Sequence, residues 1–214
     1  VIWQRSGNSI PVSVNVSARQ LMHPGFVDDL AAAIARFPEL PADSLEIEIL
    51  ESSALIGLQA ANGVIERCRA LGVQFAIDDF GTGYSSMTYL KALPAASLKI
   101  DASFTRDMLT DPDDLAIVHS VVNLGVSFRR KVIAEGVESL AHGELLLLLG
   151  CELGQGFAIA RPMPAQEMSS WQASWTLNPA WASRKSVPRE QLGMLFAEVE
   201  HRAWVAQLEA FVRG

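Results

Sequence analysis

The chain has 214 residues, of which 50% are hydrophobic and 19% charged, and its formal net charge at pH 7 is −7. This composition excludes an intrinsically disordered chain, which combines few apolar residues with much charge. The acidic balance argues against binding DNA through a general basic surface, and no apolar run approaches the roughly 20 residues that a membrane-spanning helix needs. The length predicts one large domain with a short appendix.

Two further features concern the cellular setting of the chain. Cys68 and Cys151 lack the spacing of a metal site, and two thiols in a chain of this size are typical of a reducing compartment, so we expect a cytoplasmic location. The chain begins at Val1, without an initiator Met or an apolar leader. We therefore expect a piece of a longer polypeptide, whose other segments could anchor it to a membrane.

Short runs rich in Val, Ile and Leu alternate with segments of helical periodicity. We expect strands at residues 11–16, 45–50, 73–77, 97–100, 131–134 and 156–160. Helices are expected between them, at residues 25–37, 55–71, 84–93, 112–128 and 139–149. Strands that alternate with helices predict a parallel sheet with crossover connections, and six such units fit either a doubly wound sheet or a β/α barrel.

The pattern changes after Pro164. Residues 169–189 contain three tryptophans among prolines and serines, which predicts an irregular covering segment. Residues 191–212 return to helical spacing. This last segment is expected either to pack on the preceding domain or to lead into another module.

Polar residues fall at the carboxyl ends of the predicted strands, where barrel enzymes carry their catalytic groups. They are Asn15, Glu48, Asp78, Asp79, Lys99, Asp101, Glu135 and, before the sixth strand, Gln155. Each carboxylate alone is also explained as a helix cap. Together they would repel one another in a cleft of low dielectric constant unless cations lay between them. The sequence therefore predicts a site for divalent cations.

The side chains at these ends offer oxygen rather than nitrogen or sulfur. Oxygen ligands favour Mg²⁺, Mn²⁺ or Ca²⁺ over Zn²⁺. The adjacent Asp78 and Asp79 could serve two ions, and two-metal sites are typical of phosphate-ester hydrolysis. Lys99 could hold a phosphate or a metal-bound water, although a lysine at a strand end also extends to solvent without any such role.

A glycine-rich loop follows the third predicted strand. Residues 78–86 read DDFGTGYSS, and two glycines with small hydroxyl residues allow a close approach to a ligand. The letters Asp-Phe-Gly also occur in protein kinases. We reject that interpretation because the chain has no glycine-rich nucleotide loop followed by a strand lysine, and no His-Arg-Asp catalytic loop.

These blocks together resemble the EAL-type cyclic di-GMP phosphodiesterase domain. The matching blocks are VSVNVSARQL (12–21), LEIEILES (45–52), DDFGTGYSS (78–86), LKID (98–101), AEGVE (134–138), GCELGQG (150–156) and RPMP (161–164). They follow the family's order and spacing. The resemblance implies a modified TIM-like (β/α) barrel at residues 1–168, incomplete at its N-terminus, followed by a covering segment and amphipathic helix at residues 169–214.

The resemblance also implies a function: metal-dependent hydrolysis of cyclic di-GMP to linear pGpG in bacterial second-messenger signalling. It implies two Mg²⁺ or Mn²⁺ ions and no organic cofactor. A homodimer is expected, as are attached diguanylate cyclase or sensor domains in the full-length protein, with no DNA partner.

Roles for individual residues follow from the same resemblance. Lys99 would orient the attacking water, and Glu135 would act as a metal ligand or as a base. The remaining roles are these: metal ligands Asn15, Glu48, Asp78, Asp79 and Asp101; substrate contacts Arg19, Gln20, Gln155, Arg161 and Pro162; and loop-bracing positions Glu51, Phe80, Gly81, Thr82, Gly83 and Glu138.

The chain departs from the family pattern at two points. The Glu-Ala-Leu motif, whose glutamate is a metal ligand, should precede Asn15 and is absent, so we expect the fragment as given to be impaired. Leu50 stands where the family commonly has threonine. Two alternatives stay open: a receptor that binds cyclic di-GMP without cleaving it, and a purely structural barrel that mediates protein contacts.

Overall fold

A computed structural model describes residues 10–54, 58–83, 87–183, 194 and 196–205. The contacts divide the chain into two compact units. The first, which we call unit 1, comprises Val1–Lys99 and Pro164–Ser174; unit 2 comprises Ile100–Met163 and Trp175–Gly214.

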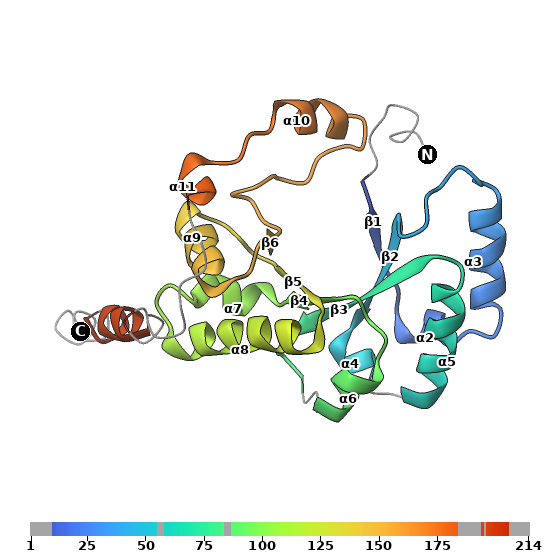
Figure 1. The fold of residues 1–214 in the computed structure, drawn as a ribbon, viewed down its shortest axis with the longest axis horizontal. Helices are drawn as coiled ribbons and strands as arrows, with labels where there is room; N and C mark the ends of the chain where they lie inside the picture. The colour runs from blue at the N-terminus through green and yellow to red at the C-terminus, as the bar shows by residue number, and fades with distance from the viewer. Residues whose placement is uncertain (1–9, 55–57, 84–86, 184–193, 195, 206–214) are drawn as a thin grey trace. The chain divides into compact units, whose positions relative to one another are not determined.

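Unit 1 is built on three parallel strands, β1 (Val12–Asn15), β2 (Leu45–Leu50) and β3 (Val73–Phe80), that pair in chain order. The strand β4 (Ser97–Ile100) begins in this unit. Its helices are α2 (Ala18–Leu21), α3 (Phe26–Ala35), α4 (Glu51–Ala54), α5 (Leu58–Arg69), α6 (Met87–Ala92) and α10 (Met168–Ser174). In Figure 1, α3 and α5 lie side by side, and an ion pair of 3.3 Å joins Asp28 of α3 to Arg67 of α5.

The core of unit 1 follows from the alternation of side chains along its strands. Ile47 and Ile49 of β2 and Phe75 and Ile77 of β3 are almost fully buried. Ile65, on the apolar face of α5, is buried as well. The opposite face of the same strands carries the polar residues described in the next subsection.

Unit 2 contains the parallel pair β5 (Lys131–Ala134) and β6 (Leu153–Gly154), with Ala134 opposite Gly154. Its helices are α7 (Ala102–Asp107), α8 (Pro112–Phe128), α9 (Leu140–Leu149) and α11 (Pro179–Ala182), and residues 196–205 are also helical. Asp111 caps α8, since its side chain accepts a hydrogen bond from the backbone N–H of Asp113 at 2.8 Å. The helix α9 ends at Gly150, whose φ of 89° is the left-handed conformation that glycine readily adopts.

The predicted elements agree with the structure where the pattern is long or continuous. The expected strands at 45–50, 97–100 and 131–134 and the helix at 112–128 have the predicted bounds. The sixth strand was predicted at the wrong place: residues 156–160 form no strand, and β6 comprises only Leu153 and Gly154. β3 continues three residues beyond the prediction, through Asp78, Asp79 and Phe80.

Several helices also differ from the predicted ranges. The helix predicted at 55–71 corresponds to α5, which comprises Leu58–Arg69, and residues 55–57 lie outside the described residues. The described part of 84–93 contains the shorter α6, and the short helices α2, α4, α7, α10 and α11 were not predicted. Of the tail helix predicted at 191–212, the described residues 196–205 are helical, and the rest lies outside the described residues.

The fold class is the predicted one. Every strand pair with a defined register is parallel, and strands and helices alternate along the chain. The order β1-β2-β3 contains no reversal of the kind that marks a doubly wound sheet. The chain has an incomplete TIM-like α/β fold. Among the described helices, none is long and apolar enough to cross a membrane.

Candidate functional site

In unit 1 the candidate residues on β1, β2 and β3 share one face of the sheet. The register places Asn15 opposite Glu48 and Leu50 opposite Asp78. Register partners in a parallel sheet point to the same side, and so do residues two apart in one strand. Glu48 and Asp78 are buried, whereas Asn15, on the edge strand, is exposed.

A buried lysine lies between the two buried carboxylates. Lys99 Nζ is 2.8 Å from Glu48 Oε2, to which it donates a hydrogen bond, and 2.9 Å from Asp78 Oδ1. Lys99 is only 4% exposed, which excludes the alternative that it extends to solvent. The contact with Asp78 Oδ1 is close enough for an ion pair, and within the described part of the chain no side chain or backbone group meets hydrogen-bond geometry with this buried oxygen.

This arrangement has an electrostatic reason. Two buried carboxylates repel each other strongly, and a cation between them offsets that repulsion. The Lys99 ammonium supplies one positive charge to the pair. Among the described residues, the Oδ1 atom of Asp78 has the ion pair with Lys99 and no further polar partner, so it has lone pairs that suit a further cation.

Glu51 holds the loop that follows β3. Its Oε2 atom accepts hydrogen bonds from the backbone N–H of Gly81 at 2.8 Å and of Gly83 at 3.2 Å. Gly81 has a φ of 106°, and a Cβ on Gly83 would lie 2.9 Å from Glu51 Oε1. The tight approach of the loop to this carboxylate therefore requires glycine at both positions.

Two further residues shape the same loop. Asp79 adopts a φ of 53°, a left-handed conformation that is uncommon outside glycine. The hydroxyl of Thr82 donates to the Asp79 carbonyl at 2.8 Å, and Phe80 is buried. The loop is thus anchored by Glu51 and by its own backbone. Residues 84–86, the end of the predicted motif, lie outside the described residues.

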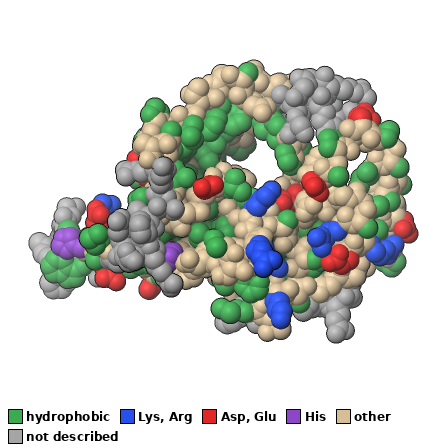
Figure 2. Space-filling model, viewed as in Figure 1, with side chains coloured by type: hydrophobic (Ala, Val, Ile, Leu, Met, Phe, Trp, Pro, Cys, Tyr) green, Lys and Arg blue, Asp and Glu red, His purple; other side chains and the backbone are tan. Residues whose placement is uncertain are grey.

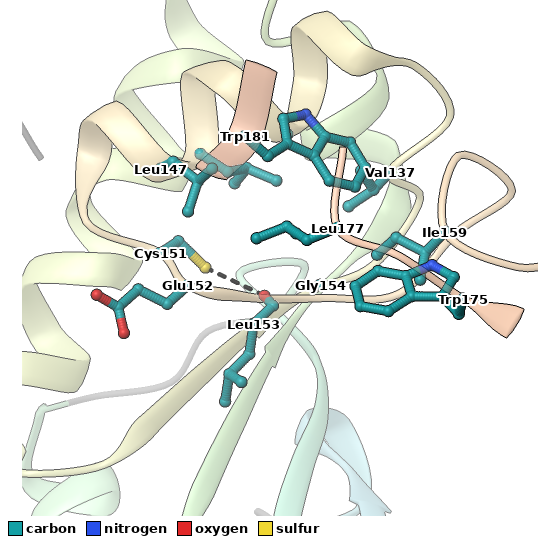
Figure 3. A pocket seen from close by; sticks show the side chains of 12 residues that line it. Val137, Leu147, Cys151, Glu152, Leu153, Gly154, Ile159, Trp175, Leu177 and Trp181 are labelled. Atoms are coloured by element: carbon teal, nitrogen blue, oxygen red, sulfur yellow. Dashed lines mark hydrogen bonds between the residues drawn. The ribbon is translucent and has the colours of Figure 1, made fainter. Parts of the chain in front are cut away.

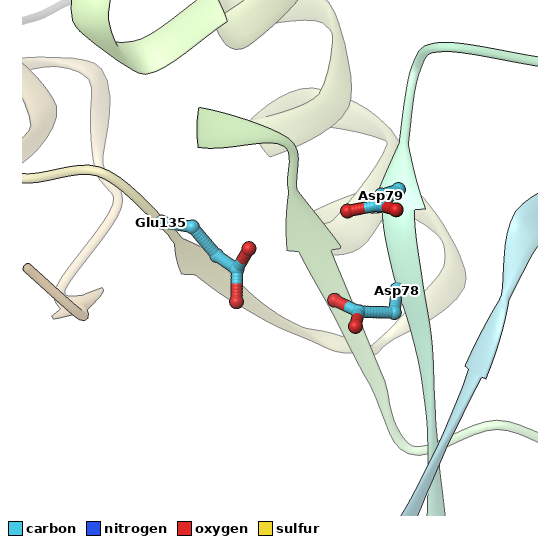
Figure 4. Close-up of side chains that lie close together, drawn as sticks. All are labelled: Asp78, Asp79 and Glu135. Carbon is cyan, nitrogen blue, oxygen red and sulfur yellow. The ribbon is translucent and has the colours of Figure 1, made fainter. Parts of the chain in front are cut away.

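Unit 2 carries the other predicted strand-end residues. The Glu135 N–H donates to the Ile100 carbonyl at 3.1 Å, and the Gln155 N–H donates to the Ala134 carbonyl at 2.8 Å. These bonds place Asp101, Glu135 and Gln155 at successive strand ends. Figure 4 shows the Asp78 and Asp79 side chains at the end of β3 and that of Glu135 directly after β5; Asp78 is buried, and Asp79 and Glu135 are half-buried.

Asp101 also has the structural role considered in the sequence analysis. It is the N-cap of α7, where its Oδ1 atom accepts from the Ser103 N–H at 2.8 Å. Capping occupies one carboxylate oxygen and fixes the direction of the side chain.

The predicted substrate residues have the following surroundings. Gln20 takes part in a capping box with Ser17 at the start of α2, and Arg19 and Pro162 are exposed. The Arg161 guanidinium lies 4.6 Å from the ring centroid of Phe157. Glu138, predicted to brace the loop, forms an ion pair of 3.6 Å with Arg106.

Unit 2 also contains an apolar cavity of about 310 Å³ (Figure 3). Cys151, Trp175, Leu177 and Trp181 are among its lining residues. Burial raises the pKa of the Cys151 thiol to about 11. None of the predicted site residues lines this cavity, so we distinguish it from the strand-end site.

Three polar residues on the inner face of unit 1, Ser13, Glu46 and Ser97, form a hydrogen-bonded group that was not predicted. Glu46 accepts hydrogen bonds from the hydroxyls of Ser13 and Ser97. The alternation Leu45-Glu46-Ile47-Glu48 placed Glu46 on the same face as Glu48, but no local pattern indicated its partners.

On the face of the molecule in Figure 2, basic and acidic side chains are interspersed rather than gathered into a basic patch.

Comparison with known proteins identifies the family. The EAL domain model matches residues 2–162, and the chain belongs to the EAL domain family. MucR of Pseudomonas aeruginosa, named as a bifunctional diguanylate cyclase/cyclic di-GMP phosphodiesterase, is 46% identical over 168 residues, which are 78% of this chain and 24% of MucR. NbdA of the same organism, named as a cyclic di-GMP phosphodiesterase, is 35% identical over 169 residues, or 79% of this chain and 22% of NbdA.

Solved structures agree with this membership. The PaMucR phosphodiesterase in complex with cyclic di-GMP matches with a TM-score of 0.75 and 44% identity, over 78% of this chain and 68% of that one. The EAL domain of Mycobacterium smegmatis DcpA matches with a TM-score of 0.77 and 37% identity, over 83% and 80%. The chain spans about a quarter of the length of the curated relatives named above.

Proposed function

We propose that this chain is the catalytic part of a metal-dependent phosphodiesterase that hydrolyses cyclic di-GMP to linear pGpG. The observation that carries the proposal is the buried Lys99 ammonium between Glu48 and Asp78. A charged group buried in this way is costly for folding and has no evident benefit for a scaffold. In a chain of the EAL family, whose relatives MucR and NbdA are named as cyclic di-GMP phosphodiesterases, this favours catalysis.

The residues fit a divalent cation. Asn15, Glu48 and Asp78 offer only oxygen ligands from one face of the sheet, and one Asp78 oxygen has no hydrogen-bond partner among the described residues. Such donors suit Mg²⁺ or Mn²⁺. We propose Asp79, Asp101 and Glu135 as ligands of a second ion. When bound, the ions would lower the pKa of a water molecule and neutralise charge on the phosphate.

We propose the following catalytic and structural roles for the other site residues. Lys99 would orient the attacking water, since its ammonium is held beside the two carboxylates proposed as metal ligands. Glu135 is the candidate base. Glu51 would keep the loop at residues 80–83 in one conformation through its bonds to Gly81 and Gly83. Substrate contacts are proposed for Arg19, Gln20, Gln155, Arg161 and Pro162.

The proposal extends to partners. The name of MucR joins a diguanylate cyclase to a phosphodiesterase, and this chain spans only a small part of MucR. We propose that the full-length protein carries further signalling domains and acts as a homodimer. A size measurement with and without those domains would test the dimer.

The decisive test is hydrolysis of cyclic di-GMP, followed by chromatographic detection of pGpG. The chain and a form extended upstream would each be assayed with Mg²⁺ and with Mn²⁺. We expect cleavage by the extended form and weak or no cleavage by the chain, because the family's Glu-Ala-Leu glutamate is a metal ligand. Glu48→Ala and Asp78→Asn should each abolish turnover, whereas Glu66→Ala, which removes an exposed carboxylate on α5, should not.

Two results would overturn the proposal. If both forms bind cyclic di-GMP by calorimetry but cleave none of it with either metal, the protein is a receptor. If Asp78→Asn cleaves at the wild-type rate in saturating metal, Asp78 is not a metal ligand and the mechanism is wrong.

A further inference from the structure

A second polar layer lies on the inner face of unit 1, beneath the level of Glu48 and Lys99. Glu46 Oε1 accepts a hydrogen bond from Ser13 Oγ at 3.0 Å, and Glu46 Oε2 accepts one from Ser97 Oγ at 2.9 Å. A single carboxylate thus joins three strands, β1, β2 and β4. Ser97 is buried, with 2% of its surface exposed.

This layer repeats the geometry of the candidate site one step earlier along each strand. Ser13 precedes Asn15 by two residues, Glu46 precedes Glu48, and Ser97 precedes Lys99. Side chains two residues apart in a strand point the same way. The separation in sequence is also the same, 51 residues, for Glu46–Ser97 and for Glu48–Lys99.

The pairing between β1 and β2 shows the same correspondence. The register places Ser13 opposite Glu46 and Asn15 opposite Glu48. A shift of β1 along β2, or of β4 relative to β2 across the intervening β3, would therefore break the Glu46 hydrogen bonds and also separate the site residues. Each of β1, β2 and β4 carries one residue of the Ser13–Glu46–Ser97 group and, two positions later, one residue of the candidate site.

We propose that Glu46 is a positioning residue, whose two hydrogen bonds hold β1 and β4 in the register that brings Asn15, Glu48 and Lys99 together. This inference rests on the proposed function. Hydrogen bonds to an ionised carboxylate are stronger than those between neutral groups. They fix β1 in particular, because β2 is the only described strand that pairs with this edge strand.

Glu46 acts through other residues and not on the substrate or the metal. Both of its oxygens accept bonds from serine hydroxyls. Two residues along a strand correspond to about 6.6 Å, so Glu46 lies a full layer away from Glu48. Its effect on the reaction is therefore expected through metal affinity and kcat rather than through binding of cyclic di-GMP.

The test compares Glu46→Ala with Glu46→Gln, in whichever form of the protein cleaves cyclic di-GMP. Glutamine keeps the shape, and its amide can accept from one serine and donate to the other. Glu66→Ala is the matched control for charge, because Glu66 is an exposed carboxylate whose partner is Arg69 on the same helix. Three quantities are measured: Mn²⁺ affinity by electron paramagnetic resonance of the free ion, kcat and KM for cyclic di-GMP, and the melting temperature.

We expect Glu46→Ala to weaken Mn²⁺ binding about tenfold and to lower kcat about tenfold, the scale typical of groups that orient metal ligands. KM should change less than about threefold, because substrate contacts lie elsewhere. Glu46→Gln should recover most of both losses, and Glu66→Ala should match the wild type.

Two outcomes would overturn the inference. Glu46→Ala could lower the melting temperature while Mn²⁺ affinity and kcat per folded molecule stay at wild-type values, which would leave Glu46 a purely structural role. Equal losses in Glu46→Gln and Glu46→Ala would show that hydrogen bonding is not the cause. If the wild type cleaves no cyclic di-GMP, the proposed function fails, and the Mn²⁺ affinities still decide the role of Glu46.

Discussion

At the scale of the residue, Lys99 carries the most information. Its ammonium contacts Glu48 at 2.8 Å and Asp78 at 2.9 Å, and all three side chains are buried. In such a cluster the removal of one member leaves the others with uncompensated charge, which costs about 3–5 kcal/mol. Stability and activity therefore depend on the same side chain, and the two effects have to be measured separately.

For Lys99→Ala we expect kcat to fall by about 10²–10⁴-fold, the range lost with a group that positions a proton-transfer partner. KM for cyclic di-GMP should change little, because the lysine is proposed to act on the water. Steady-state kinetics at saturating Mn²⁺ measure both constants. Lys91→Ala, at an exposed lysine of α6, is the control; a wild-type kcat in Lys99→Ala would contradict the proposed role.

A second residue-scale prediction concerns Cys151. Burial raises the pKa of its thiol to about 11, and the thiolate is the reactive form. At pH 8 a thiol of pKa about 11 is roughly 0.1% ionised, against about a quarter for a free cysteine. Alkylation of folded Cys151 by iodoacetamide should therefore be at least about 100-fold slower than alkylation of the denatured chain, and should accelerate as the pH rises towards 11. Mass spectrometry of the Cys151 peptide measures the rate, and fast labelling of the folded protein at pH 8 would refute the burial.

At the scale of the element, the contact between α9 and α11 is set by a glycine. Trp181 is 8% exposed, and its indole N–H donates to the Leu140 carbonyl at 2.9 Å. A Cβ on Gly143 would lie 2.4 Å from the Trp181 ring. The absence of a side chain at Gly143 allows the segment after residue 175 to pack on α9.

Gly143→Ala should therefore destabilise the protein by about 1–3 kcal/mol, the usual cost of overpacking a filled site. Gly63→Ala is the matched comparison, because Gly63 lies in α5 and a Cβ there would meet nothing within 4 Å. That substitution should stabilise the protein by about 0.5–1 kcal/mol through helix propensity. Denaturant unfolding of both variants checks the pair, and equal effects of the two substitutions would contradict the packing argument.

The helices and strands differ in how well their bounds could be predicted from the sequence. Residues 45–50, 97–100 and 131–134 are short segments in which Leu, Ile or Val recur between helical stretches, so their bounds were predictable from that alternation. The two-residue β6 and the four-residue α2 and α11 are too short to produce a periodic pattern. The bonds from Glu46 to Ser13 and Ser97 join residues 33 and 51 positions apart, and no local rule predicts such partners.

At the scale of the whole molecule, the candidate residues are scattered over most of the chain, from Asn15 to Gln155. Their convergence could be predicted only because parallel strands present their carboxyl ends at one edge. The burial of Lys99 depends on three-dimensional packing, whereas the hydrogen bonds of Gln20 belong to a local capping box with Ser17. The sequence therefore indicated which residues to consider, whereas the structure distinguishes the buried cluster from residues that cap helices.

Metal binding is expected to change the stability of the whole folded chain. A ligand that binds only the folded state stabilises it by RT ln(1 + [L]/Kd), or about 2.7 kcal/mol at a concentration of 100 Kd. Mn²⁺ should therefore raise the melting temperature of the wild type, and EDTA should reverse the rise and abolish cleavage of cyclic di-GMP. Asp78→Asn should show no such rise, because it replaces a carboxylate oxygen by an amide nitrogen and removes the negative charge that attracts the cation. Glu66→Ala should respond like the wild type, which separates specific binding from general screening of an acidic chain. An equal rise in Asp78→Asn and in the wild type would place the Mn²⁺ away from Asp78, and the metal site proposed here would then be wrong.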